Sequence, residues 1–132
     1  MHYAICGLWG LIGIIVAFAF GGWTEALTLL LAAMAVDYVT GVIAAVKEGK
    51  GLNSMIGFWG LIRKGATMLI ILIAHRVDLL LGSGNVTMTG AIFFYLANEL
   101  ISITENCGRI GLPVPHRLRR MIEVLKDKGD DR

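Results

Sequence analysis

The feature that most constrains this chain is a long uncharged run close to its first residue. From Tyr3 to Thr24 the sequence contains no Asp, Glu, Lys or Arg. At about 1.5 Å per residue, a helix of that length crosses a hydrocarbon core of about 30 Å. A cleaved signal peptide is the competing interpretation, because Ala17-Phe18-Ala19 has the small-x-small form of a cleavage site. The opening MHYAICG has no Lys or Arg to form the basic start of such a peptide, so we favour a retained membrane helix.

Three more apolar runs follow, and together they predict an all-α integral membrane protein. They cover residues 26–46, 65–81 and 86–103, and short glycine-containing turns precede the first and the last of them. The chain is 56% hydrophobic with a mean hydropathy of +0.71, outside the usual balance of a soluble domain. We therefore predict four transmembrane helices arranged as two hairpins.

The segment between the second and third runs has a different character. Residues 47–64 carry basic side chains at both ends and the aromatic residues Phe58 and Trp59 inside. Aromatic side chains are enriched at headgroup depth, so we expect this segment to lie at the membrane interface.

The last part of the chain is expected to form a basic amphipathic tail. We divide the sequence into a transmembrane domain, residues 1–108, and a tail, residues 109–132, in which two prolines interrupt any helix. Beyond them, apolar residues recur at helical spacing among basic ones. The apolar members are Leu118, Met121, Ile122 and Leu125, and the basic residues among them that we single out are Arg117, Arg119 and Arg120.

The distribution of basic residues predicts the topology. Of twelve Lys and Arg, four lie within residues 47–64, seven lie from Arg109 onward, and Arg76 alone lies inside a predicted span. Four spans place the two basic segments on the same side of the membrane. The positive-inside rule makes that side cytoplasmic, so we expect both termini there and a multi-pass location in a bacterial inner membrane.

Polar residues within the spans are the candidate functional residues. Polar residues in the fourth run and just after it recur at steps of three and four and form one polar stripe, which cannot face lipid and must meet protein or water. We consider these residues and one acidic residue of the second run to be oligomerisation or pore-lining candidates: Asp37, Tyr95, Asn98, Glu99, Ser102, Glu105 and Asn106.

The third run adds an intramembrane charge cluster formed by His75, Arg76 and Asp78. Ionisable groups at membrane depth are costly and seek partners. Arg76 could pair with Asp37, or the cluster could be local and extend toward the outer surface. All these groups could instead form a buried polar network that fixes the packing of the helices.

Small residues are expected to permit close helix packing, although such patterns are frequent in membrane helices. The candidates are Gly7, Gly10, Gly13 and Gly41.

Cys6 and Cys107 lack the spacing of a zinc site or a disulfide framework. We find no HExxH, GxSxG or phosphate-binding loop, so we expect no enzyme, metal site or cofactor.

Four stretches of the sequence together resemble the bacteriophage holin family, which includes the toxin-secretion holins. They are MAVDYVTGVIAAVKEGKGLNS, RKG, IAHRVD and NELISITENCGRIGLPVPHRL, and the resemblance covers about residues 30–125. The positions that carry it are Asp37, Thr40, Gly41, Leu52, Ser54, Lys64, Asp78, Asn98, Glu99, Ser102, Glu105, Asn106, Gly111, Pro113 and Pro115.

The resemblance implies a phage or prophage protein that accumulates in the inner membrane, oligomerises and opens lesions. Its partners would be membrane lipids, further copies of itself and, functionally, a cell-wall hydrolase or an exported toxin, with no nucleic acid. Two alternatives fit the residues: a small ion or proton channel using Asp37 and Glu99, and a membrane docking or scaffold protein whose polar stripe binds another protein.

Overall fold

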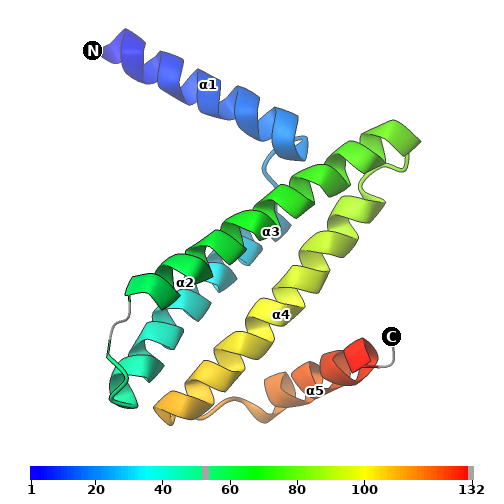
Figure 1. Cartoon of the computed structure of the whole chain (residues 1–132). Helices are drawn as coiled ribbons and strands as arrows, with labels where there is room; N and C mark the ends of the chain where they lie inside the picture. Colours follow the sequence, from blue (N-terminus) through cyan, green and yellow to red (C-terminus); the bar gives the residue numbers. More distant parts are fainter. Residues whose placement is uncertain (52–53, 131–132) are drawn as a thin grey trace.

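The computed structural model describes residues 1–51 and 54–130, and over this range it consists of five helices without a strand (Figure 1). Leu52, one of the positions that carry the family resemblance, lies outside the described residues. The side chain of Leu125 likewise lies outside the described part of the tail. The prediction of an all-α protein is confirmed.

The first two helices are joined by a short turn. Helix α1 comprises His2–Phe20 and ends at Gly21, whose φ of 73° is a left-handed conformation that favours glycine. Helix α2 comprises Glu25–Lys47. Thr24 caps its start, where the hydroxyl accepts a hydrogen bond from the Leu27 N–H at 3.3 Å.

The remaining helices are α3 (Ser54–Leu81), α4 (Val86–Ile110) and α5 (His116–Asp130). Helix α4 ends at Gly111 with a φ of 90°, and Pro113 and Pro115 follow before α5 begins. Helices α1 to α4 are each long and apolar enough to cross a membrane. The protein is therefore an integral membrane protein with four candidate spans.

Helices α2, α3 and α4 form the packed part of the molecule, with α4 lying against both α2 and α3. We call the end of this bundle that contains Lys47, Ser54 and Ile110 the basic end, and the opposite end, where α3 turns into α4, the far end. The apolar core lies in the half nearer the far end. Its members are Leu27, Leu30, Ala33, Met34, Ile71, Ala74, Met88, Ile92 and Leu96.

Helix α1 lies apart from this bundle. Figure 1 shows it diverging from α2 beyond the short joint, and its nearest neighbour is α3. Ala19 is its one buried residue. The predicted first hairpin thus has its short turn but lacks close packing along α2. The physical reason is that an uncharged helix has no polar group that requires a protein partner in a bilayer.

Helix α3 begins earlier than the sequence pattern predicts. The hydropathy pattern predicts a third span at residues 65–81 and an interfacial segment before it, but the helix begins at Ser54. It is 28 residues long, about 42 Å, and therefore exceeds a hydrocarbon core of about 30 Å. Lys64 lies inside α3, and its ion pairs with carboxylates of α2 and α4 allow this charged residue to lie within the bundle.

Candidate functional site

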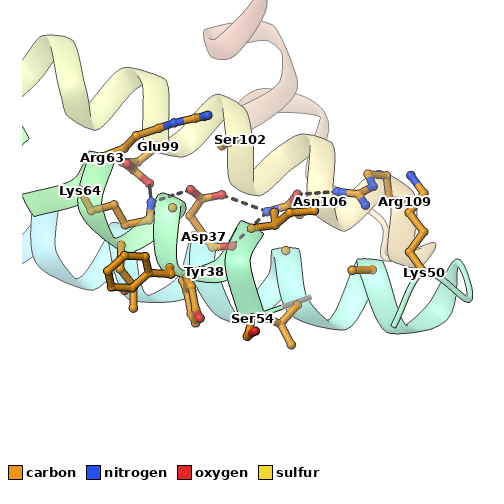
Figure 2. Close-up of a pocket in the computed structure, with 18 of the residues that line it drawn as sticks. Asp37, Tyr38, Lys50, Ser54, Arg63, Lys64, Glu99, Ser102, Asn106 and Arg109 are labelled. Atoms are coloured by element: carbon orange, nitrogen blue, oxygen red, sulfur yellow. Dashed lines mark hydrogen bonds and ion pairs between the residues drawn. The ribbon is translucent and has the colours of Figure 1, made fainter. Parts of the chain in front are cut away.

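Three charged side chains from three different helices meet in the half of the bundle nearer the basic end (Figure 2). The Lys64 Nζ lies 2.8 Å from the Asp37 Oδ2 and 2.8 Å from the Glu99 Oε2. Each of the three residues lies ten or eleven residues from the basic end of its helix, so they share one level of the bundle. Two carboxylates and one ammonium give this triad a formal charge of −1.

The triad is largely removed from solvent. The three side chains are between 14% and 18% exposed. Charges withdrawn from water are tolerated when they are paired in good geometry, and removing one partner leaves the other uncompensated. The Asp37, Lys64 and Glu99 side chains therefore link α2, α3 and α4 as one unit.

Asn106 extends the network toward the basic end. Its side-chain amide donates to the Asp37 Oδ1 at 2.9 Å and to the Thr40 hydroxyl at 3.1 Å. Its carbonyl oxygen accepts a hydrogen bond from the Arg109 Nη1 at 3.3 Å. Gly41 lies beside this amide: a Cβ at that position would make an ordinary van der Waals contact with the Asn106 nitrogen, at 3.5 Å, so its role in helix packing stays a prediction.

Arg109 and Glu48 join the ends of α4 and α2. The Arg109 guanidinium donates to both oxygens of the Glu48 carboxylate, at 2.7 and 3.0 Å. Hydrogen bonds from Arg109 and then from Lys50 lower the pKa of Glu48 from 4.5 to about 2. The Lys47 ammonium also donates to the Ile110 carbonyl across the same two helices.

A cavity of about 1100 Å³ lies beside this network. The charged triad, Ser102, Asn106 and Arg109 are among the residues that line it, and Figure 2 shows them along one path from Lys64 to the basic end. A second, apolar cavity of about 470 Å³ continues between α2 and α3 toward the far end. The basic half of the bundle is therefore hollow and charged.

The structure divides the predicted polar stripe of α4 between two surfaces. Glu99, Ser102 and Asn106 line the cavity, whereas Asn98 and Glu105 are exposed. Tyr95 is half-buried against the apolar core, and its ring packs edge-on against Phe94 at 5.2 Å between centroids. Part of the stripe therefore faces the interior of the subunit, and part of it faces the outer surface.

The predicted charge cluster of α3 is separated into three different contacts. Asp78, 1% exposed, accepts hydrogen bonds from the Ser83 hydroxyl and from the backbone N–H groups of Thr87 and Met88, at 2.7 to 2.9 Å. It therefore caps the start of α4 from the preceding helix.

The other two residues of that cluster contact the end of α1. The Arg76 guanidinium lies 3.5 Å from the centroid of the Phe18 ring. His75 is buried against Gly21, where an added Cβ would lie 2.7 Å from the imidazole Cε1. The alternative pair between Arg76 and Asp37 is not formed: Asp37 binds Lys64, and Arg76 lies twelve residues, about 18 Å, farther along α3.

The remaining glycine candidates lie on α1, beside open space in the described part of the chain. A Cβ at Gly7, Gly10 or Gly13 would meet no side chain and no atom of another element within 4 Å among the described residues. Their role in helix packing stays a prediction. No group of three His, Cys, Asp or Glu side chains in the described ranges gathers to hold a metal ion.

Sequence reasoning did not assign Lys64, Glu48 or Arg109 to the site. The depth of the acidic residues in the membrane could have identified Lys64. Asp37 and Glu99 lie at nearly the same level in their predicted spans, and two neighbouring carboxylates require a cation. Lys64 was available to supply it, but its place at the edge of an aromatic segment favoured an interfacial position instead.

Comparisons with known proteins agree with these observations. Residues 14–127 match the model of the bacteriophage holin family. The chain is 42% identical over 121 residues to an uncharacterised protein of Halalkalibacterium halodurans, which covers 88% of this chain and 87% of the relative. It is 33% identical over 111 residues to a probable holin of Bacillus phage phi105, covering 84% and 82%. No solved structure matches the chain.

Proposed function

This chain belongs to the bacteriophage holin family, and we propose that it oligomerises in the bacterial inner membrane and opens lesions there. Through them an endolysin or a toxin would leave the cytoplasm, and an endolysin would reach the cell wall. The probable holin of Bacillus phage phi105 supports this proposal by its name.

The observation that carries the proposal is the charged network inside a membrane-spanning bundle. In one subunit, Lys64 satisfies Asp37 and Glu99, so the closed bundle can remain in lipid. If α3 moves away from α2 and α4, these groups require water or a neighbouring subunit. The same residues are therefore compatible with two arrangements: a closed subunit in which they pair with one another, and an open assembly in which they line a water-filled opening.

Asn98 supports the assembly step. Its side chain is exposed on α4 at a depth where the surroundings are lipid or protein. An amide in hydrocarbon lacks hydrogen-bond partners, whereas the same amide on a second copy supplies both a donor and an acceptor. We assign this surface of α4 to contacts between subunits.

We further propose that the basic end faces the cytoplasm, together with both termini. This follows from the basic residues at the ends of α2 and α4, in the first part of α3 and in α5. In oriented vesicles of a Cys6→Ser, Cys107→Ser background, Ser83→Cys should react with an impermeant thiol reagent from outside and Ser54→Cys should not. The reverse labelling pattern would show that the basic end faces outward.

The function is tested by inducing the chain in a bacterium together with a cell-wall hydrolase that lacks an export signal. Growth should continue until a threshold, after which respiration stops abruptly, the membrane becomes permeable and the cells lyse. Cells with the hydrolase alone should keep growing. Continued growth with abundant inserted protein, whatever hydrolase is supplied, would refute the proposal.

An ion or proton channel is the second candidate, and the charged lining of the 1100 Å³ cavity favours it. A channel would give ion-selective currents at low expression without a lysis threshold. Passage of a folded protein of endolysin size through the membrane would exclude this candidate.

A further inference from the structure

The charges that line the larger cavity do not balance within the protein. Four cations line it, namely Lys50, Arg63, Lys64 and Arg109. The carboxylates of Asp37 and Glu99 both bind Lys64, while Glu48 binds Arg109 and Lys50. Counted with Glu48, which lies outside the lining, the carboxylate partners number three, so the four lining cations exceed them by one.

Arg63 carries that excess. Among the described residues, its guanidinium makes no ion pair or hydrogen bond. The residue is exposed on α3, and Figure 2 shows its side chain extending past Glu99 toward Ser102 of α4. The free cation is thus directed across the gap between α3 and α4.

Residues of both α3 and α4 line the cavity. Figure 1 shows α3 and α4 together at the far end and separated at the basic end. Gly60 lines the cavity there, and a Cβ at that position would meet no side chain and no other element within 4 Å. Ile70, two turns deeper on the face of α3 that carries Arg63, is 47% exposed. A polar opening beside an apolar surface matches an amphipathic ligand.

The depth of Arg63 matches the headgroup region. The residue lies nine positions after the start of α3, about 13 Å along a helix that exceeds the hydrocarbon core by about 12 Å. Side chains lean toward the start of their own helix, so the guanidinium reaches back toward the basic end. With that excess on the basic side, the Arg63 Cα lies at the edge of the hydrocarbon core and its guanidinium extends toward the phosphates.

We infer that the gap between α3 and α4 binds one anionic phospholipid. The headgroup phosphate contacts Arg63, and the acyl chains lie deeper in the bilayer along the apolar surface at Ile70. One excess positive charge favours a monoanionic lipid such as phosphatidylglycerol over a zwitterionic one. Basic pockets between transmembrane helices are a known form of lipid headgroup site. This inference is independent of the lysis proposal, because it concerns the subunit in any bilayer.

The test measures lipids retained by the full chain. The protein is purified in detergent, stripped of lipid, exposed to phosphatidylglycerol or phosphatidylcholine at equal concentration, and examined by native mass spectrometry. The wild type should retain one phosphatidylglycerol per subunit in preference to phosphatidylcholine. Arg63→Gln should weaken that binding about fivefold, as expected for one basic residue near the lipid surface.

Two variants, each with a matched control, distinguish the effect of the Arg63 charge from the effect of the open space at Gly60. Gly60→Leu keeps every charge but fills the gap, so it should also reduce retention. Arg120→Gln removes a basic residue outside the cavity, and Gly90→Leu adds the same volume elsewhere on α4. Neither control should change retention, and circular dichroism should show that all four variants remain helical.

Three results would overturn the inference. Equal retention of the two lipids would show that no anionic headgroup is recognised. Equal losses from Arg63→Gln and Arg120→Gln would show only general attraction of basic residues to anionic lipid. Displacement of the lipid by glycerol phosphate alone would show a phosphate site rather than a lipid site. Because none of these measurements involves lysis, failure here and failure of the holin proposal are distinguishable.

Discussion

The two halves of the α2–α4 bundle are stabilised by different interactions. The half nearer the far end has a continuous apolar core, in which Leu27, Leu30 and Ile71 are fully buried. The half nearer the basic end has a cavity of about 1100 Å³ and is linked by the ion pairs of Lys64 and Arg109. One half is packed and the other is hollow and charged.

This difference indicates where the bundle can open. Close packing of apolar side chains is lost gradually as helices separate, and lipid can replace the lost neighbours. Ion pairs in a hollow region must be replaced by water or by another subunit. The far half is therefore suited to hold the helices together, and the basic half is suited to exchange its partners.

The largest effect is expected at the triad. Lys64→Met leaves the Asp37 and Glu99 carboxylates without their shared cation, which should cost about 3 kcal/mol, the low end for breaking a buried ion pair. The measurement is equilibrium denaturation by SDS in mixed micelles, followed by circular dichroism. The variant should also bring forward the onset of permeabilisation in induced cells.

Two controls sharpen this prediction. Lys50→Met removes a side chain that is 72% exposed and should change stability by less than about 0.5 kcal/mol. Neutralising the whole triad, with Asp37→Asn and Glu99→Gln added to Lys64→Met, should restore most of the lost stability. Equal losses from Lys64→Met and Lys50→Met would show that ion pairs do not hold the basic half.

The next largest effect is expected in the apolar core. Leu30→Ala should cost about 2 kcal/mol, the lower range for a buried leucine, because lipid rather than water surrounds the separated helices. Leu80→Ala, at a site that is 85% exposed, is the matched control. If the two halves act differently, Leu30→Ala lowers stability in SDS but leaves the onset of permeabilisation unchanged. An onset as early as that of Lys64→Met would contradict the comparison.

The membrane spans were the more predictable feature of the molecule from sequence. Apolar runs of membrane length predict spans because a bilayer requires each spanning backbone to satisfy its own hydrogen bonds. The positions of Asp37 and Glu99 along their spans also contain their shared depth. These properties depend on distance along one helix, which the sequence gives directly.

Contacts between helices were less predictable. Lys64 binds two carboxylates, and Asp78 caps the helix that follows its own. Both depend on how each helix is rotated about its axis, which hydropathy does not determine. The separate position of α1 was also missed, because an uncharged run has no group whose partner could be inferred.

A smaller effect is expected on the outer surface of α4. Asn98→Leu should leave the stability of the subunit within about 0.5 kcal/mol, since the side chain is exposed. Loss of an intersubunit hydrogen bond worth about 0.6 kcal/mol should weaken association roughly threefold. The measurement is energy transfer between labelled copies in liposomes, with Phe93→Leu as the control. Unchanged association would remove Asn98 from the proposed interface.

The smallest effect is expected at Glu48, where the ends of α2 and α4 meet in water. Its pKa of about 2 lies below the usual 4.5, so pairing with Arg109 stabilises the folded state above pH 4.5 and is lost as the pH falls toward 2. Carbon-13 NMR of the Glu48 carboxyl should show this titration. Arg109→Gln should raise the pKa toward 4.5, and Lys50→Gln should raise it less, because the Lys50 hydrogen bond is the weaker cause. A wild-type pKa near 4.5 would mean that these helix ends separate in solution, and the ion pairs holding the basic half would then be those of the triad.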